Sequence, residues 1–125
     1  MREIDINGEK YNIDCNSWTY IQFKKVFGIG IFEDIAIIRN YLIKQTESMI
    51  KIKESKSPIE SISKYMSEDV SEFFEAITRI TYIMIYTAND GKIISYDEWL
   101  KSIKKINIDD DWIVEVTEFA VNCFH

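Results

Sequence analysis

The residues that could perform catalysis or bind a metal are few in this sequence and lie far apart. The single histidine is the last residue, His125, and the two cysteines, Cys15 and Cys123, stand near opposite ends of the 125-residue chain. Nucleophilic catalysis pairs a nucleophile with a base, and zinc sites need several Cys or His ligands. Phosphate-binding loops and the HExxH, CxxC and GxSxG motifs are also absent from the sequence. We therefore expect no enzyme, no catalytic residue, no metal and no cofactor.

Residues 89–99 are similar to the second half of a calcium-binding EF-hand loop, with an acid, a glycine and a later acid at matching positions. Counting back from Gly91 as the sixth loop position puts Tyr86 and Ala88 where the first and third ligands belong. Neither side chain binds Ca²⁺. A turn followed by a helix capped at Ser95 explains the same residues, so we expect a turn without calcium.

Two clusters of acidic residues are explained by helix structure more simply than by catalysis or metal binding. Glu68, Glu72 and Glu75 share one face of an expected helix, where a solvated acidic stripe is common. The run Asp109–Asp111 is typical of a helix start, because negative charge is favourable in the first turn.

Composition and charge indicate one folded, acidic domain over residues 1–125. Hydrophobic residues make up 46% of the chain, which can therefore bury a core. Residues 1–66 hold 10 basic and 9 acidic side chains (net +1), and residues 67–125 hold 5 and 12 (net −7). The net charge of −6 repels a phosphate backbone, so we expect no nucleic-acid partner.

The sequence favours the cytoplasm and no membrane contact. Acidic residues within 1–5 interrupt any export signal, and the apolar stretch at 80–86 is far shorter than a membrane span. Because cytoplasmic thiols are kept reduced, we expect Cys15 and Cys123 to be buried, reduced thiols.

A β-hairpin is predicted within residues 1–15. Asn7-Gly8 stands between two alternating segments, and both residues accept the positive φ of a two-residue turn. Such a turn fixes the register, which is Ile6 opposite Glu9, Asp5 opposite Lys10, and Ile4 opposite Tyr11. Ile4, Ile6, Tyr11 and Ile13 then share an apolar face, and Asp5 pairs with Lys10 on the other face.

Residues 16–125 predict a compact bundle of about five helices, so the fold class is mainly α with an N-terminal β-hairpin. Helical periodicity and capping residues place the helices at 16–28, 31–54, 67–88, 95–106, and from 109 almost to the end. In the second, Ile35, Ile38, Leu42 and Ile43 should form one buried face. The third is apolar nearly all round near its end, which predicts the centre of the core.

The segment 44–67 is polar, contains Pro58, and has no pattern that fixes its conformation. We expect a helix break and the most flexible part of the chain near 53–60.

The last helix carries a broad apolar band, formed by Trp112, Ile113, Val116, Phe119, Ala120, Cys123 and Phe124. Core packing and a binding surface for a partner helix both explain such a band. Phe119→Asp separates them, because an interface variant stays folded and a core variant does not.

The order of these elements resembles the tail assembly chaperones of tailed bacteriophages and prophages of Gram-positive hosts. The resemblance rests on the hairpin at 6–11, the aromatic-rich helix ending at 25–28, the apolar helix followed by 91–100, and a short helix beginning near Trp112.

This resemblance implies a non-enzymatic protein of the host cytoplasm that coats the long, helical tape measure protein and keeps it soluble during virion assembly. It implies tail tube protein as a second partner, and it makes this chain the short form of a longer frameshifted product. Self-association into a homo-oligomer is suggested by the apolar band of the last helix and not by the resemblance. A partner helix would lie on the third and last helices by helix-in-groove recognition. The expected binding residues are Trp112, Val116, Phe119, Phe73 and Ile77.

Two alternatives come from other classes. A small regulatory protein would bind calcium at the EF-hand-like residues 89–99. An acidic inhibitor would use the −7 half of the chain as a mimic of nucleic acid, and its binding would depend strongly on salt.

Overall fold

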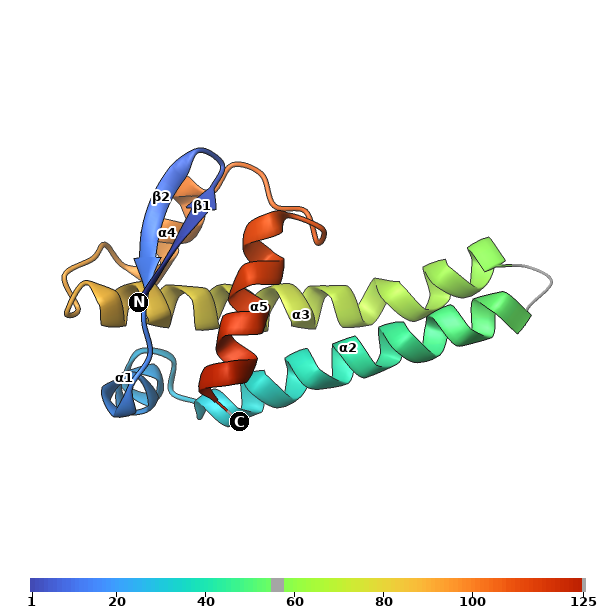
Figure 1. Ribbon diagram of the computed structural model, residues 1–125, viewed down its shortest axis with the longest axis horizontal. Helices are drawn as coiled ribbons and strands as arrows, with labels where there is room; N and C mark the ends of the chain where they lie inside the picture. The colour runs from blue at the N-terminus through green and yellow to red at the C-terminus, as the bar shows by residue number, and fades with distance from the viewer. Residues whose placement is uncertain (55–57, 125) are drawn as a thin grey trace.

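Residues 1–54 and 58–124 fold as an N-terminal hairpin followed by five helices, as the sequence predicts. The computed structural model describes residues 1–54 and 58–124, and within them the side chains outside 46–69. The elements are β1 (Arg2–Ile6), β2 (Glu9–Ile13), α1 (Ser17–Phe27), α2 (Ile31–Glu54), α3 (Pro58–Ala88), α4 (Tyr96–Ser102) and α5 (Asp111–Cys123). The two long helices, α2 and α3, lie side by side, and the other elements gather around the start of α2 and the end of α3 (Figure 1).

The hairpin has the predicted register, with Ile6 opposite Glu9 and Ile4 opposite Tyr11. Asn7 has a φ of 55° and Gly8 a φ of 91°, the positive values that a two-residue turn requires. The apolar face is buried through Ile4, Ile6 and Ile13, whereas Tyr11 is half-buried.

The predicted pair between Asp5 and Lys10 is wrong, although the two residues are opposite in register. The Asp5 carboxylate accepts the Gly8 N–H at 2.7 Å, and the Lys10 ammonium lies 3.9 Å from Glu3. Because the Asp5 carboxylate is already hydrogen-bonded within the turn, the exposed Lys10 pairs with Glu3, the next carboxylate on the same face of the hairpin.

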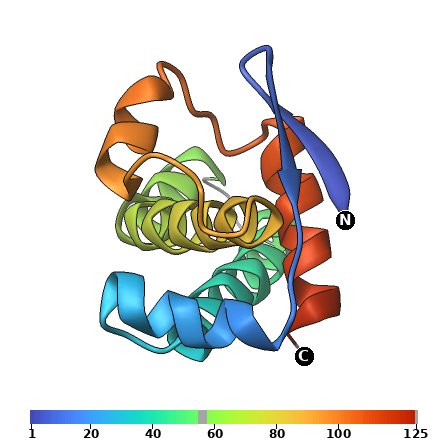
Figure 2. The same ribbon diagram turned by 90° about the vertical axis from the view of Figure 1, so that its left-hand side faces the viewer.

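The centre of the core is α3, as predicted. From Ala76 to Ile85 every side chain except Arg79 is buried. α5 lies on one side of this helix and α4 on the other (Figure 2). None of the helices in the described part of the chain is long and apolar enough to span a membrane.

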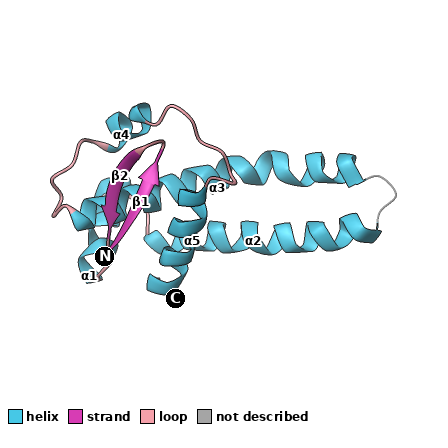
Figure 3. Ribbon diagram, turned by 45° about the horizontal axis from the view of Figure 1, so that its top comes forward, coloured by secondary structure: helices cyan, strands magenta, loops and turns pink. Residues whose placement is uncertain are grey.

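The ends of two helices differ from the sequence prediction. α3 begins at Pro58 and not at Ser67, since proline is tolerated in the first turn of a helix. α4 ends at Ser102 and not at 106, where the Ser102 hydroxyl donates to the Trp99 carbonyl at 2.5 Å. The break predicted near 53–60 falls between the end of α2 and the start of α3. Of the range 53–60 that was predicted to be most flexible, residues 53–54 and 58–60 belong to these helices, and residues 55–57 lie outside the described residues. Figure 3 shows the two long helices extending as a pair beyond the strands and α4.

An ion pair between a half-buried arginine and a fully buried aspartate joins α2 to α3. The Asp34 side chain is fully buried, and its two carboxylate oxygens accept hydrogen bonds from Nε and Nη2 of Arg79, both at 2.7 Å. This bidentate bond raises the pKa of Arg79 above its ordinary value. The pair therefore fixes the relative position of the two long helices.

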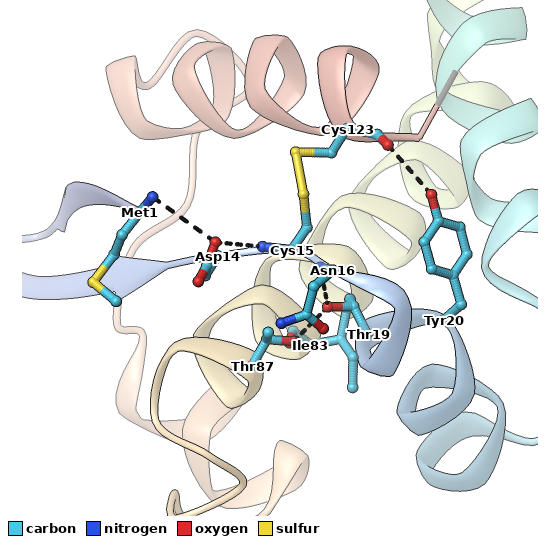
Figure 4. The surroundings of a disulfide bond; sticks show 9 residues. All are labelled: Met1, Asp14, Cys15, Asn16, Thr19, Tyr20, Ile83, Thr87 and Cys123. Atoms are coloured by element: carbon cyan, nitrogen blue, oxygen red, sulfur yellow. Dashed lines mark hydrogen bonds and ion pairs between the residues drawn. A yellow bond between two sulfur atoms is a disulfide. The ribbon is translucent and has the colours of Figure 1, made fainter.

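The two cysteines form a disulfide, so the prediction of reduced thiols is wrong in this structure. Cys15 follows β2 and Cys123 ends α5, and the bond joins them across 108 residues of sequence (Figure 4). The Tyr20 hydroxyl also donates to the Cys123 carbonyl at 3.3 Å. Folding brings the two ends of the chain together, a proximity that the sequence separation hides.

We expect the disulfide to contribute about 4 kcal/mol to the free energy of unfolding, because a bond closing so long a loop restricts the unfolded chain. The measurement is urea unfolding of the oxidised protein and of the Cys15→Ser/Cys123→Ser double variant. Reductant should lower the unfolding midpoint of the wild-type protein and leave that of the variant unchanged. An insensitive wild-type midpoint would show that the bond does not form in solution.

Removing the buried carboxylate should destabilise the fold strongly. Asp34→Ala leaves the half-buried Arg79 guanidinium without its partner, and we expect a loss of about 3 kcal/mol in the free energy of unfolding, the lower end of the range for a buried pair. Glu33→Ala is the matched control, since Glu33 is exposed in the same turn of α2. We expect it to cost less than about 1 kcal/mol. Equal losses in the two variants would contradict a stabilising role for the ion pair.

Candidate interaction surface

Four of the five residues expected to bind a partner lie in the core. Phe73 and Ile77 of α3 are 2% and 0% exposed, and Trp112 and Val116 of α5 are 3% and 0% exposed. A partner cannot contact these four side chains while the helices keep their positions. Phe119 is half-buried beside them.

The apolar band of α5 is thus used for core packing, the first of the two readings that the sequence left open. Ile113, Ala120 and Phe124 are buried together with Trp112 and Val116. α5 packs on β1 and α3, with a smaller contact to α2. The sequence could not decide this, because the band looks the same whether the fold or a partner covers it.

Large apolar side chains are exposed instead on α2. Phe32 is 59% exposed and Ile43 56% exposed, and the exposed residues Ala36 and Arg39 lie between them. The spacings of four, three and four residues place all four on one side of the helix. We call Phe32, Ala36, Arg39 and Ile43 the α2 outer face.

The α2 outer face exists because α2 has two apolar sides. Ile31, Ile35 and Ile38 are buried against the core, on the adjacent side of the helix. The prediction that Ile43 belongs to this buried face is wrong, and Leu42 is 39% exposed. The spacing of Phe32, Ala36 and Ile43 was the available signal, and it was missed because the buried face alone accounts for an amphipathic helix.

α1 extends the apolar surface and adds positive charge. The Tyr20 ring lies 5.5 Å from that of Phe32 and 5.1 Å from that of Phe124. Lys24 follows Tyr20 by one turn on the same side of α1 and is exposed, as are Lys25 and Ile21. The surface therefore combines aromatic and aliphatic groups with lysines.

The charge of this region is opposite to that of the whole protein. Residues 17–45 contain four basic side chains, Lys24, Lys25, Arg39 and Lys44, against two acidic ones, a net charge of +2. One of those acids is Asp34, whose carboxylate is bound to Arg79. Because the whole chain carries −6, the remaining residues carry −8.

Apart from the α2 outer face, the surface has a groove between α3 and the segment from α4 to Ile106, with a volume of about 360 Å³. Its lining is mostly apolar, from Phe74, Leu100, Ile103 and Ile106, with Glu75, Thr78, Tyr96, Lys104 and Lys105 completing it. The hydroxyls of Thr78 and Tyr96 are hydrogen-bonded to each other at 2.9 Å. Its polar groups are thus already paired within the protein or reach solvent.

The EF-hand-like segment forms the expected turn and capped helix. Asp90 and Gly91 have φ values of 52° and 79°, and the Gly91 N–H donates to the Tyr86 carbonyl at 2.8 Å. The Ser95 hydroxyl accepts the Glu98 N–H at the start of α4. Within residues 1–45 and 70–124, no three His, Cys, Asp or Glu side chains are grouped to hold a metal ion.

Comparisons with known proteins give this chain no relative. No protein-family model, curated protein or solved structure matches it.

One buried tyrosine, Tyr82, and one half-buried tyrosine, Tyr96, should make the fold sensitive to alkali. Burial raises the pKa of Tyr96 and of Tyr82, and nearby Tyr86 raises that of Tyr82 further. Because the fold favours the protonated form of these tyrosines, the stability that they contribute is fully present below the unfolded-state pKa of about 10. It is lost as the pH rises through the higher folded-state pKa.

The measurement is urea unfolding at about pH 8 and about pH 11, on either side of the ordinary tyrosine pKa. We expect Tyr96→Phe to lose less stability between the two pH values than the wild-type protein. An identical alkaline loss in Tyr96→Phe and Tyr82→Phe and in the wild-type protein would contradict this assignment.

Proposed function

We propose that the chain is a non-enzymatic tail assembly chaperone that binds the tape measure protein and keeps it soluble while the tail tube assembles. The identity of the partner rests on the resemblance of the sequence to that family. The observation that carries a binding function is the α2 outer face, where Phe32 and Ile43 remain more than half exposed.

The physical support lies in the shape and chemistry of this face. Large apolar groups left in water beside lysines are typical of surfaces that bind other molecules. A straight stripe along one helix is complementary to another helix, because side-chain ridges of one fit grooves of the other. A long apolar helical protein offers many such stripes, and covering them would prevent its aggregation.

The proposed location is the host cytoplasm, and the disulfide bears directly on it. Bonds such as Cys15–Cys123 persist in oxidising compartments and are rare in the reducing cytoplasm. On this proposal the pair is a reduced dithiol in cells. Trapping the thiols with an alkylating reagent at lysis measures the state, and a fully oxidised pair would contradict a cytoplasmic protein.

Charge on the α2 outer face should abolish partner binding without unfolding the chaperone. We expect Phe32→Asp and Ile43→Asp to bind the tape measure protein at least about tenfold more weakly, because a carboxylate in an apolar contact is desolvated without a partner. The measurement is co-expression with a tape measure protein, which the resemblance predicts to be encoded next to this gene, followed by affinity capture and quantification of soluble tape measure protein.

Ile94→Asp is the matched control, since Ile94 is 50% exposed and lies outside this face. It should capture the tape measure protein like the wild type, and circular dichroism should show all three variants folded. Failure of the wild-type chain to capture or solubilise the tape measure protein would overturn the proposed function.

A further inference from the structure

We infer that the α2 outer face binds an amphipathic helix of a partner protein, and that this helix places a carboxylate opposite Arg39. The inference rests on the proposed function, since it describes the chemistry of the partner that the chaperone would hold. It is argued from the stripe itself, from the charge within it, and from the charges around it.

The stripe has the spacing of a helix-packing seam. Phe32, Ala36, Arg39 and Ile43 repeat at four, three and four residues, the alternation that faces a second helix in coiled-coil packing. The eleven steps from Phe32 to Ile43 rise about 16 Å along the axis of α2, or three turns. Ala36 is small, so a partner helix can approach closely between the larger side chains of Phe32 and Ile43.

Arg39 makes the α2 outer face selective for a partner that carries a carboxylate. Its side chain is exposed and forms no ion pair with any described residue. A helix packed on Phe32 and Ile43 would cover Arg39 and remove water from its guanidinium. Covering an unpaired charge is costly, whereas a carboxylate of the partner can accept two parallel hydrogen bonds from the guanidinium. The partner therefore needs Asp or Glu at that position.

Surrounding charges favour the same partner. Lys24 and Lys25 on α1 are exposed, and Glu33 is the one exposed acid among residues 17–45. An acidic helix would be attracted to this basic region and repelled by the remainder of the protein, which carries −8. Electrostatic attraction would thus direct it to the α2 outer face.

A second copy of the chain fits this face less well. In a two-fold dimer through α2, the same basic surface would meet itself, and Arg39 would lie near its own symmetry mate. Like charges held together across an interface are destabilising. The charge of the face thus favours a different, acidic partner.

The test uses the full chain and two synthetic helical peptides of about 20 residues, long enough to form several turns. Both peptides carry leucine at every heptad a and d position except the central a position. In one peptide the central a position and the flanking positions are Glu, and in the other they are Lys. Affinities for the wild-type protein, Arg39→Glu and Lys92→Glu are measured by fluorescence anisotropy. Lys92 is exposed outside this face, so its variant changes net charge equally.

We expect the wild-type protein and Lys92→Glu to bind the Glu peptide at least about tenfold more tightly than the Lys peptide. Arg39→Glu should lose this preference or reverse it. An unchanged preference in Arg39→Glu would overturn the inference. The inference would also be overturned if the wild-type protein did not bind the Glu peptide, or if it bound vesicles of phosphatidylserine but neither peptide. A third contradicting result is dimerisation of the wild-type chain that Phe32→Asp abolishes.

The peptide result is independent of the tape measure experiment. If the chain does not capture the tape measure protein but Arg39→Glu changes the preference between the peptides, the proposed function is wrong and the inference about the partner helix is supported. If the chain captures the tape measure protein but Arg39→Glu binds both peptides as the wild type does, the inference about the partner helix is wrong and the proposed function is supported.

Discussion

The structure depends on one constraint, the burial of the second half of α3. Side chains point in every direction from a helix, so a stretch that is apolar all round must be surrounded on all sides. The segment from Ala76 to Ile85 is covered by β2, α1, α2, α4 and α5, all of which contact α3. The short elements gather at this end of the two long helices because this is the part that needs cover (Figure 1).

Polar groups within this core set the relative positions of the helices. Apolar contacts tolerate small shifts, but hydrogen bonds between buried groups do not. The Thr19 and Thr87 hydroxyls are bonded at 2.8 Å between α1 and α3, and Asp34 and Arg79 join α2 to α3. The Cys15–Cys123 bond adds a covalent link between the hairpin end and α5.

Covering α3 also decides which surface is left for a partner. α5 uses most of its apolar band in the core, where Trp112, Ile113 and Val116 are buried and Phe119 is half-buried. α2 needs only one side to contact α3, and its second apolar side remains in water. The exposed stripe is thus a consequence of where the core ends, and its basic surroundings come from α1, which the core places next to the start of α2.

The sequence by itself determined the local features. Asn7-Gly8 set the hairpin register, Asn16 and Gly28 bounded α1, and the continuous apolar pattern identified α3 as the centre. These follow from backbone preferences and periodicity, which act over a few residues.

The tertiary structure alone decided which apolar face is covered and which distant residues meet. Periodicity identifies the apolar sides of α2 and α5 but carries no information on their neighbours. Only the packing around α3 buries Trp112 and Val116 and leaves Phe32 and Ile43 in water. The meeting of Cys15 and Cys123, and of Asp34 and Arg79, likewise depends on long-range packing, for which sequence spacing gives no signal.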